Sequence, residues 1–225
     1  MKYALKNALI LDGSENMQPQ SGLAVLIDGK KIAAIVRDTA IPSGIDTVDL
    51  HGAYLMPGLI NMHVHLAGSG KPQKKQRDNE KLVNTIMSSA LTRAVAYRMV
   101  CGFARDELMS GVTTIRTVGG LGDFDTRLRD ETASGAKLGP RILAANRGIS
   151  VPGGHMAGSV AVAAHSIEEA LSHLHRSAEE KVDLIKLMIT GGVLDAKEKG
   201  TPGELKMPPE MVRAVCDEAH RMGYR

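Results

Sequence analysis

The sequence has few aromatic residues and an almost balanced charge. It contains no Trp, four Tyr and two Phe in 225 residues, so few rings are available to stack on nucleic-acid bases. Lys and Arg number 28 against 25 Asp and Glu, which gives a net charge of +3. Such a balance does not indicate a polybasic surface for nucleic acid or for a membrane. We therefore expect a small-molecule partner and no nucleic acid.

Long apolar runs and paired cysteines are also lacking. No apolar run reaches the roughly 18 residues that a membrane span requires, and residues 1–3 are not followed by the apolar region of a signal peptide. Cys101 and Cys216 are far apart and belong to no C-x-x-C motif, so we expect both to be reduced and partly buried. These features predict a cytoplasmic protein that does not contact a membrane.

Residues 1–56 consist of short apolar segments separated by turns. The segments at 8–11, 24–27 and 32–36 are too short for helices, and Asp-Gly pairs at 12–13 and 28–29 separate them. With 43% hydrophobic and 24% charged residues the chain has the composition of a folded protein. We predict a small antiparallel β layer for residues 1–56.

From residue 57 to 225 the pattern alternates between strand and helix. Such alternation implies a parallel sheet, here with four β/α units. Residues 224 and 225 would then begin a fifth strand. The predicted strands are 59–65, 112–117, 141–146 and 183–189, and the predicted helices are 79–110, 125–134, 167–180 and 209–222.

A pair of histidines ends the first of these strands. Side chains two residues apart point to the same face of a strand, so His63 and His65 could offer ring nitrogens to one metal ion. Parallel α/β barrels place their chemistry at the carboxyl ends of the strands. The alternative is a pair of buried histidines with structural hydrogen bonds, but the apolar strand leading into the pair favours metal ligands.

A lysine lies within the fourth predicted strand. Lys186 is surrounded by Leu, Ile and Met, where an unpaired ammonium would cost several kcal/mol. A neutral lysine amine can react with carbon dioxide, and the resulting carbamate can bridge two metal ions. The alternative is that Lys186 extends its ammonium out of the strand end. Because the sequence also contains the candidate metal ligands His63 and His65, the carbamate is the favoured interpretation of Lys186.

Together these segments resemble the amidohydrolase superfamily. The resemblance rests on residues 49–52 (DLHG), 57–65 (PGLINMHVH), 111–116 (GVTTIR), and Ile185-Lys186 ahead of 190–192 (TGG). It is strongest to the branch of imidazolonepropionase-like and Xaa-Pro or Xaa-Lys/Arg dipeptidase-like enzymes. The resemblance implies a (β/α)₈ barrel with a small β-sandwich domain, of which residues 57–225 would form the first four β/α units and residues 1–56 part of the sandwich.

The resemblance also implies a binuclear metal site. His63 and His65 would bind the more buried ion, Lys186 would be the carboxylated bridge, and the metal is usually zinc, with two ions per complete site. Two later histidines and a late aspartate would lie beyond residue 225. Because a closed barrel takes about 250 residues, we expect these 225 residues to require the missing half of the barrel, and we expect a homo-oligomer.

Three further positions bear on the site. His155 follows two glycines after the third predicted strand and resembles the Gly-Gly-His loop of the dipeptidase-like branch. It is expected either to bind substrate or to make only a structural hydrogen bond. Thr117 stands where members of this branch often have Asp. Asp123 and Asp125 are interpreted as helix caps rather than catalytic acids.

The function predicted from these residues is metal-dependent hydrolysis of a C–N bond. The substrate would be a dipeptide or an N-acyl amino acid, attacked by a metal-activated hydroxide, with Lys186 and His155 at the site. A first alternative is a mononuclear imidazolone hydrolase or deaminase in which Lys186 is structural. A second is a non-catalytic barrel that serves as a scaffold, which the histidine pair argues against.

Overall fold

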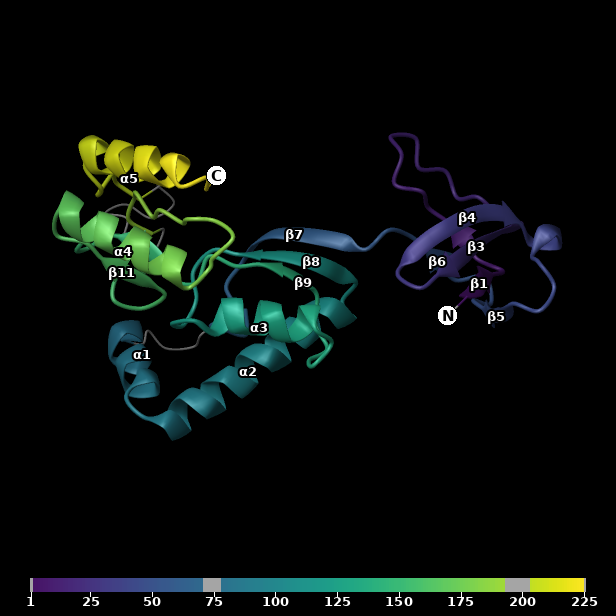
Figure 1. Cartoon of the computed structure of the whole chain (residues 1–225), viewed down its shortest axis with the longest axis horizontal. Helices are drawn as coiled ribbons and strands as arrows, with labels where there is room; N and C mark the ends of the chain where they lie inside the picture. Colours follow the sequence, from purple (N-terminus) through teal and green to yellow (C-terminus); the bar gives the residue numbers. More distant parts are fainter. Residues whose placement is uncertain (1, 71–77, 193–202, 225) are drawn as a thin grey trace. The chain divides into compact units, whose positions relative to one another are not determined.

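The computed structural model describes residues 2–70, 78–192 and 203–224. The chain divides into two compact units, Met1–Gly58 and Leu59–Arg225, and their elements are labelled in Figure 1. Across the described residues, no helix combines the length and the apolar character needed to cross a membrane.

The first unit is a β structure of two small sheets. One sheet has the order β4-β3-β1-β5, and the other pairs β2 with β6. A small core of Ala8, Ile10 and Val25 holds this unit together. The elements are β1 (Lys2–Lys6), β2 (Leu9–Ile10), β3 (Leu23–Asp28), β4 (Lys31–Arg37), the 3₁₀ turn η1 (Asp38–Ala40), β5 (Asp46–Asp49) and β6 (Tyr54–Leu55).

The prediction of an antiparallel layer is only partly right. The turn at Gly29, where φ is +61°, joins β3 and β4 as an antiparallel hairpin, and β1 also pairs antiparallel with β3. By contrast, β1 with β5 and β2 with β6 are parallel pairs. A tight turn can only reverse the chain, whereas the longer path through η1 lets β5 run beside β1 in the same direction.

The second unit begins with a three-stranded parallel sheet. Its strands β7 (Leu59–Val64), β8 (Val112–Thr117) and β9 (Arg141–Leu143) lie in the order β7-β8-β9, and both pairings are parallel, as predicted. The helices α2 (Ala90–Met109) and α3 (Phe124–Ala133) lie on the same side of this sheet (Figure 1).

The predicted helix 79–110 is two helices, α1 (Asn79–Met87) and α2. Ser89 between them has an extended backbone, with φ −137° and ψ 154°, and its hydroxyl accepts a hydrogen bond from the Thr92 amide. A serine in this position satisfies an amide that the first turn leaves unpaired, so it starts a new helix in the middle of the apolar periodicity.

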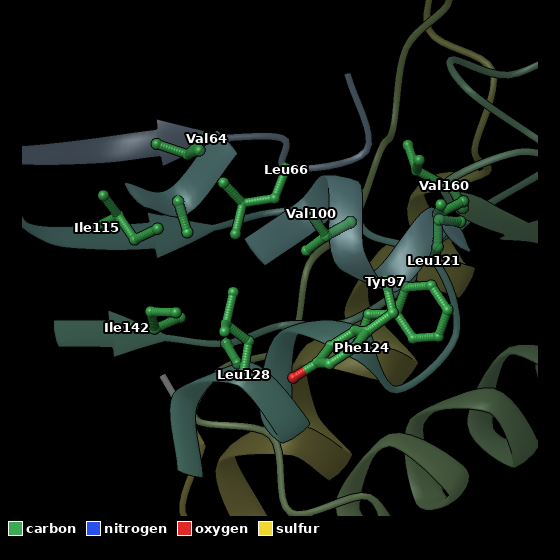
Figure 2. Close-up of a cluster of buried hydrophobic side chains, with 14 of the residues drawn as sticks. Val64, Leu66, Tyr97, Val100, Ile115, Leu121, Phe124, Leu128, Ile142 and Val160 are labelled. Atoms are coloured by element: carbon green, nitrogen blue, oxygen red, sulfur yellow. The ribbon is translucent and has the colours of Figure 1, made fainter. Parts of the chain in front are cut away.

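The core of this sheet lies between its strands and the two helices. Figure 2 shows Ile115 and Ile142 from neighbouring strands close to Leu128 of α3. The rings of Tyr97 and Phe124 meet edge to face with centroids 5.2 Å apart. The Tyr97 hydroxyl donates to Glu131 over 2.7 Å, so the polar end of this buried ring is satisfied.

The remaining elements form a second core. They are β10 (Gly148–Ser150), β11 (Ala161–Ala163), α4 (Ile167–Glu179) and α5 (Pro209–Arg221). Parallel pairing joins β10 and β11, and α4 packs on α5 around Leu174 and Val215. The predicted strand 141–146 is shorter than expected and ends at Leu143, and Asn146, with φ +52°, has a left-handed backbone that does not belong to a strand.

The predicted strand 183–189 is much shorter than expected. Only Leu187 pairs, in a single parallel bridge to Ile149 of β10. Two backbone hydrogen bonds support this bridge: the Ile149 amide donates to the Lys186 carbonyl over 2.8 Å, and the Met188 amide donates to the Ile149 carbonyl over 2.9 Å. The short length of β10 limits the pairing, but the direction is the predicted one.

Asp125 is the most deeply buried carboxyl group among the described residues, and the interpretation of it as a cap is wrong. It lies inside the first turn of α3 and is only 1% exposed. Asp123 precedes the helix, and its side chain makes no capping hydrogen bond. Burial raises the pKa of Asp125 to about 6, although a hydrogen bond from the Thr117 hydroxyl opposes this rise. Its Oδ2 atom has no hydrogen-bond partner among the described residues.

We expect Asp125→Asn to change how the free energy of unfolding depends on pH. The unfolded-state pKa is near 3.8 and the folded-state pKa about 6, so only the folded protein holds this proton between those values. The stabilisation is present below pH 4 and is lost as the pH rises through 6. At about 1.4 kcal/mol per pH unit, the Asn variant should gain up to about 3 kcal/mol over the wild type between pH 4 and 7.

Urea unfolding of the full-length protein at several pH values measures this difference. Asp123→Asn is the matched control, because Asp123 is exposed two residues away, and its difference from the wild type should not change in this way. Parallel pH profiles for Asp125→Asn and the wild type would contradict the expectation.

Candidate metal centre

The histidine pair lies at the carboxyl end of β7, and its ring nitrogens converge. The Nε2 atoms of His63 and His65 are 3.2 Å apart, and the ring centroids are 5.2 Å apart. His63 is exposed and His65 is half-buried. The alternation of side chains along an extended chain therefore brings the two rings to one point, as the sequence predicts.

His65 has a second contact that orients its ring. Its Nδ1 atom is 3.1 Å from the carbonyl oxygen of Gly119, just after β8. A carbonyl oxygen only accepts hydrogen bonds, so this contact places the proton of the neutral ring on Nδ1 and leaves a lone pair on Nε2. The second nitrogen of a metal-binding histidine is held in this way in many metal sites.

Gly119 cannot be replaced easily at this place. Its φ is +145°, and a Cβ atom on it would lie 3.0 Å from Nδ1 and Cε1 of His65 and 3.0 Å from Cε of Met188. The backbone of Gly119 is therefore in close contact with one side of the His65 ring. The glycines at 119, 120 and 122 lack the spacing of a dinucleotide-binding loop and predict only a turn at the end of a strand, so the local pattern does not reveal this contact.

Lys186 lies near the histidine pair, on the segment that follows β9 and β10. Its aliphatic chain packs on Gly148, where an added Cβ would lie 3.3 Å from Lys186 Cγ and 3.0 Å from Met188 Cε. The Met188 methyl group thus approaches both Gly119, beside His65, and Gly148, beside Lys186. This buried methionine, which the sequence analysis did not recognise, fills the space between the two parts of the site.

The start of the Lys186 segment is held by Asp183. One oxygen of its carboxylate accepts hydrogen bonds from the Ala144 amide over 2.8 Å and from Arg129 over 2.9 Å. The segment is thereby tied to the end of β9 and to helix α3. These bonds compensate for the single bridge that the segment makes with β10.

The electrostatic environment favours uncharged nitrogen atoms. Burial, followed by the charge of Arg116, lowers the pKa of Lys186. Burial and the nearby charge of Lys186 lower the pKa of His63, and burial is also the main cause of a lowered pKa at His65. A metal ion and carbon dioxide both react with the unprotonated form of such groups, so the shifts suit the predicted roles.

Arg116 is a component of the site that the sequence analysis did not name as functional. Its Nε atom donates to the Met62 carbonyl over 2.8 Å. This bond holds the guanidinium beside β7, where its charge lowers the pKa of both His63 and Lys186. The position after it, Thr117, is completely buried and lies opposite Val64 in the parallel register.

His155 lies in the loop after β10. Its amide donates to the Thr190 carbonyl over 3.0 Å, which ties the loop to the end of the Lys186 segment. The charge that His155 carries when protonated contributes to lowering the pKa values of His63 and His65. The four predicted site residues are thus close enough for their charges to interact. The role of His155 towards a substrate stays a prediction.

The two imidazole nitrogens fit a metal ion, although two donors are few for a metal site. Two neutral imidazoles with facing Nε2 atoms repel each other's lone pairs unless a proton or a cation lies between them, and imidazole suits zinc. Within residues 2–70, 78–192 and 203–224, no group of three or more His, Cys, Asp or Glu side chains is arranged to hold a metal ion. The described residues therefore provide two imidazole groups and one lysine at this place.

Comparison with known proteins assigns both parts of the chain to known families. Residues 54–225 match the model of the amidohydrolase family, and residues 2–55 match that of the NagA composite domain. A segment of 76 residues is 37% identical to a dihydroorotase of Syntrophus aciditrophicus, and it covers 33% of this chain and 17% of that protein.

Solved structures resemble the chain over almost its whole length. A putative prolidase from Bifidobacterium longum has a TM-score of 0.74 and 31% identity, covering 99% of this chain and 48% of that one. A Xaa-Pro dipeptidase with methionine in its active site has a TM-score of 0.75 and 28% identity, covering 100% and 55%. The chain thus spans about half the length of these structures and corresponds to the N-terminal portion of a barrel with a small sheet domain. With residues 54–225 matching the family model and a histidine pair where the parallel strands end, this chain belongs to the amidohydrolase family.

Proposed function

We propose that this protein is a metal-dependent hydrolase of a C–N bond in a small substrate, a dipeptide or an N-acyl amino acid. The observation that carries the proposal is the convergence of the two Nε2 atoms at 3.2 Å, with the His65 ring oriented by Gly119. A scaffold protein has no need for such a pair at the end of a strand. The position agrees with the general location of chemistry in parallel α/β barrels.

His63 and His65 would hold one divalent ion, for which zinc is the first candidate. Lys186, whose pKa is lowered by burial, would contribute as a carbamate to a second ion. In the carboxylation, the amine nitrogen forms a bond to the carbon of carbon dioxide and the amine releases one proton. The product is an anionic carboxylate, and this charge replaces a cation that would repel the metal.

Gly119, Arg116 and His155 would orient the reacting groups and set the charge of the site. A bound divalent ion supplies a water nucleophile of lowered pKa and polarises the scissile carbonyl. Gly119 holds the proton of His65 on Nδ1, and Arg116 holds its charge close to His63 and Lys186. His155, on a loop tied to Thr190, would orient the substrate by a hydrogen bond to a carboxylate or carbonyl oxygen.

The similar proteins support the substrate class. The putative prolidase and the Xaa-Pro dipeptidase are named for the cleavage of dipeptides, which is why a dipeptide or an N-acyl amino acid is the first candidate. The similarity to dihydroorotases favours a second candidate, a cyclic amide. A mononuclear imidazolone hydrolase or deaminase is the remaining enzymatic alternative, and it would need Lys186 only for structure.

We expect His63→Ala combined with His65→Ala to remove zinc from the full-length protein, because the variant lacks both imidazole ligands. Elemental analysis after purification measures the metal content. His173→Ala combined with His175→Ala is the matched control, since these residues have the same spacing but lie on helix α4. Unchanged metal content in the first variant would contradict the assignment.

Lys186→Ala should abolish hydrolysis, and short carboxylic acids in the assay should restore part of it by occupying the place of the carbamate. The reason is that the variant lacks the amine that carbon dioxide would modify. Lys206→Ala is the control, because Lys206 is an exposed lysine paired with Glu204. An active Lys186→Ala variant that needs no added acid would show that Lys186 is structural.

A substrate panel tests the proposed reaction itself. We expect the full-length, zinc-loaded protein to hydrolyse dipeptides or N-acyl amino acids, and we expect the His63→Ala, His65→Ala variant to lose this activity by at least about 100-fold. The panel should also contain dihydroorotate, hydantoins and imidazolones. Turnover of the cyclic compounds alone would replace the first candidate with the second.

A further inference from the structure

We infer that Asp125 is a positioning residue that holds the turn at Gly119 and Gly120 against the ring of His65. The inference rests on the proposed function, since it concerns how a metal-binding histidine is oriented. It assigns a role to a buried carboxyl group that the proposed reaction does not otherwise use.

The first observation is the place of the carboxyl group. Asp125 is only 1% exposed and lies in the first turn of α3. A Cβ atom built on Gly120 would overlap its Cγ and both of its oxygen atoms. The carboxyl group therefore lies directly against the backbone of Gly120, and only a glycine leaves room for it.

The second observation is what lies on the other side of this turn. Gly119 precedes Gly120, its carbonyl oxygen is 3.1 Å from His65 Nδ1, and its backbone contacts the imidazole ring. Asp125 and His65 are thus in contact with adjacent residues of one turn. A displacement of Gly120 would move the Gly119 carbonyl, and with it the partner that orients the His65 ring.

The third observation is the position of Asp125 beside the end of β8. The Thr117 side chain lies close enough to Asp125 to lower the pKa of its carboxyl group, and Thr117 lies opposite Val64, the residue between the two histidines. The Val118 amide also donates to the Val64 carbonyl over 3.1 Å. Asp125 therefore lies beside both the end of β8 and the glycine turn that follows it.

These contacts explain why a polar group occupies a buried position. A buried polar atom without a partner destabilises the folded state, and Oδ2 of Asp125 has none among the described residues. An apolar residue of the same size would avoid this cost but would lose the polar interaction with Thr117. The geometry thus favours a carboxyl or amide group whose shape fits Gly120 and whose oxygen interacts with Thr117.

The test measures zinc affinity of the full-length protein by competition with a chromophoric chelator. Asp125→Ala should weaken zinc binding by about tenfold, in the range seen when groups that orient ligands are removed. Asp125→Asn keeps the shape and an acceptor oxygen, so it should stay within about threefold of the wild type, and Asp123→Ala is the control that should not change. An Asn variant as weak as the Ala variant would assign the effect to charge and overturn the inference.

A pair of variants tests the contact with Gly120. Gly120→Ala should weaken zinc binding, because its methyl group collides with the Asp125 carboxyl group. In the double variant Gly120→Ala, Asp125→Ala the methyl group enters the space that the carboxyl group leaves. The two effects should then be less than additive, and full additivity would contradict direct contact.

A measurement without metal separates this inference from the proposed function. In apoprotein labelled with ¹⁵N-histidine, the ring-nitrogen shifts of His65 report the proton on Nδ1 and its hydrogen bond. We expect these shifts to change in Asp125→Ala and to stay as in the wild type in Asp123→Ala. Unchanged shifts would overturn the inference, whereas a wild-type protein that shows the expected shifts but binds no zinc would overturn only the metal assignment.

Discussion

The parallel pairing of β7 with β8 is the interaction on which the candidate site depends. Val64 lies opposite Thr117, and the Val118 amide bonds to the Val64 carbonyl. This register places Gly119 beside His65, so that a backbone carbonyl orients the ring. A shift of one residue would turn the side chains of β7 to the other face and separate the histidines from this partner.

Residues with small or flexible side chains complete the packing around this register. Gly119 lies in the loop after β8 and Gly148 begins β10, and the Met188 methyl group approaches both. Glycine allows this approach because it has no Cβ atom, and methionine adapts to the irregular space that remains. The Lys186 segment needs such contacts, since one bridge at Leu187 is its only pairing with β10.

Positive charges surround His63 in the part of the chain that the structure describes. Besides burial, the charges of Lys186, Arg116 and His155 lower the pKa of His63, and within residues 2–70, 78–192 and 203–224 no carboxylate contributes to this shift. When these side chains are protonated, their positive charges repel a metal ion and attract anions. Conversion of Lys186 to a carbamate would replace a positive charge with a negative one. The positive charge of Arg116 would remain and would attract a substrate carboxylate. The electrostatics of the chain therefore agree with the proposed chemistry.

The sequence by itself predicted the alternation of strand and helix after residue 57 and named the candidate site residues, but it did not predict β10 and β11. Two local patterns carry the site: an apolar segment that ends in His63 and His65, and a lysine, Lys186, among Leu, Ile and Met. Alternation of side chains along an extended chain is enough to predict that the two imidazole rings converge.

Three features of the fold were not predicted: the parallel pairs in the first unit, the division of the helix at Ser89 and the shortness of the 183–189 strand. They depend on which segments meet and on single backbone angles. Only the tertiary structure decided that Gly119 orients His65, because this contact joins residues that strand register brings together and not local spacing. It also decided that Asp125 is buried against Gly120, because the fold of the loop after β8 turns the carboxyl group inward.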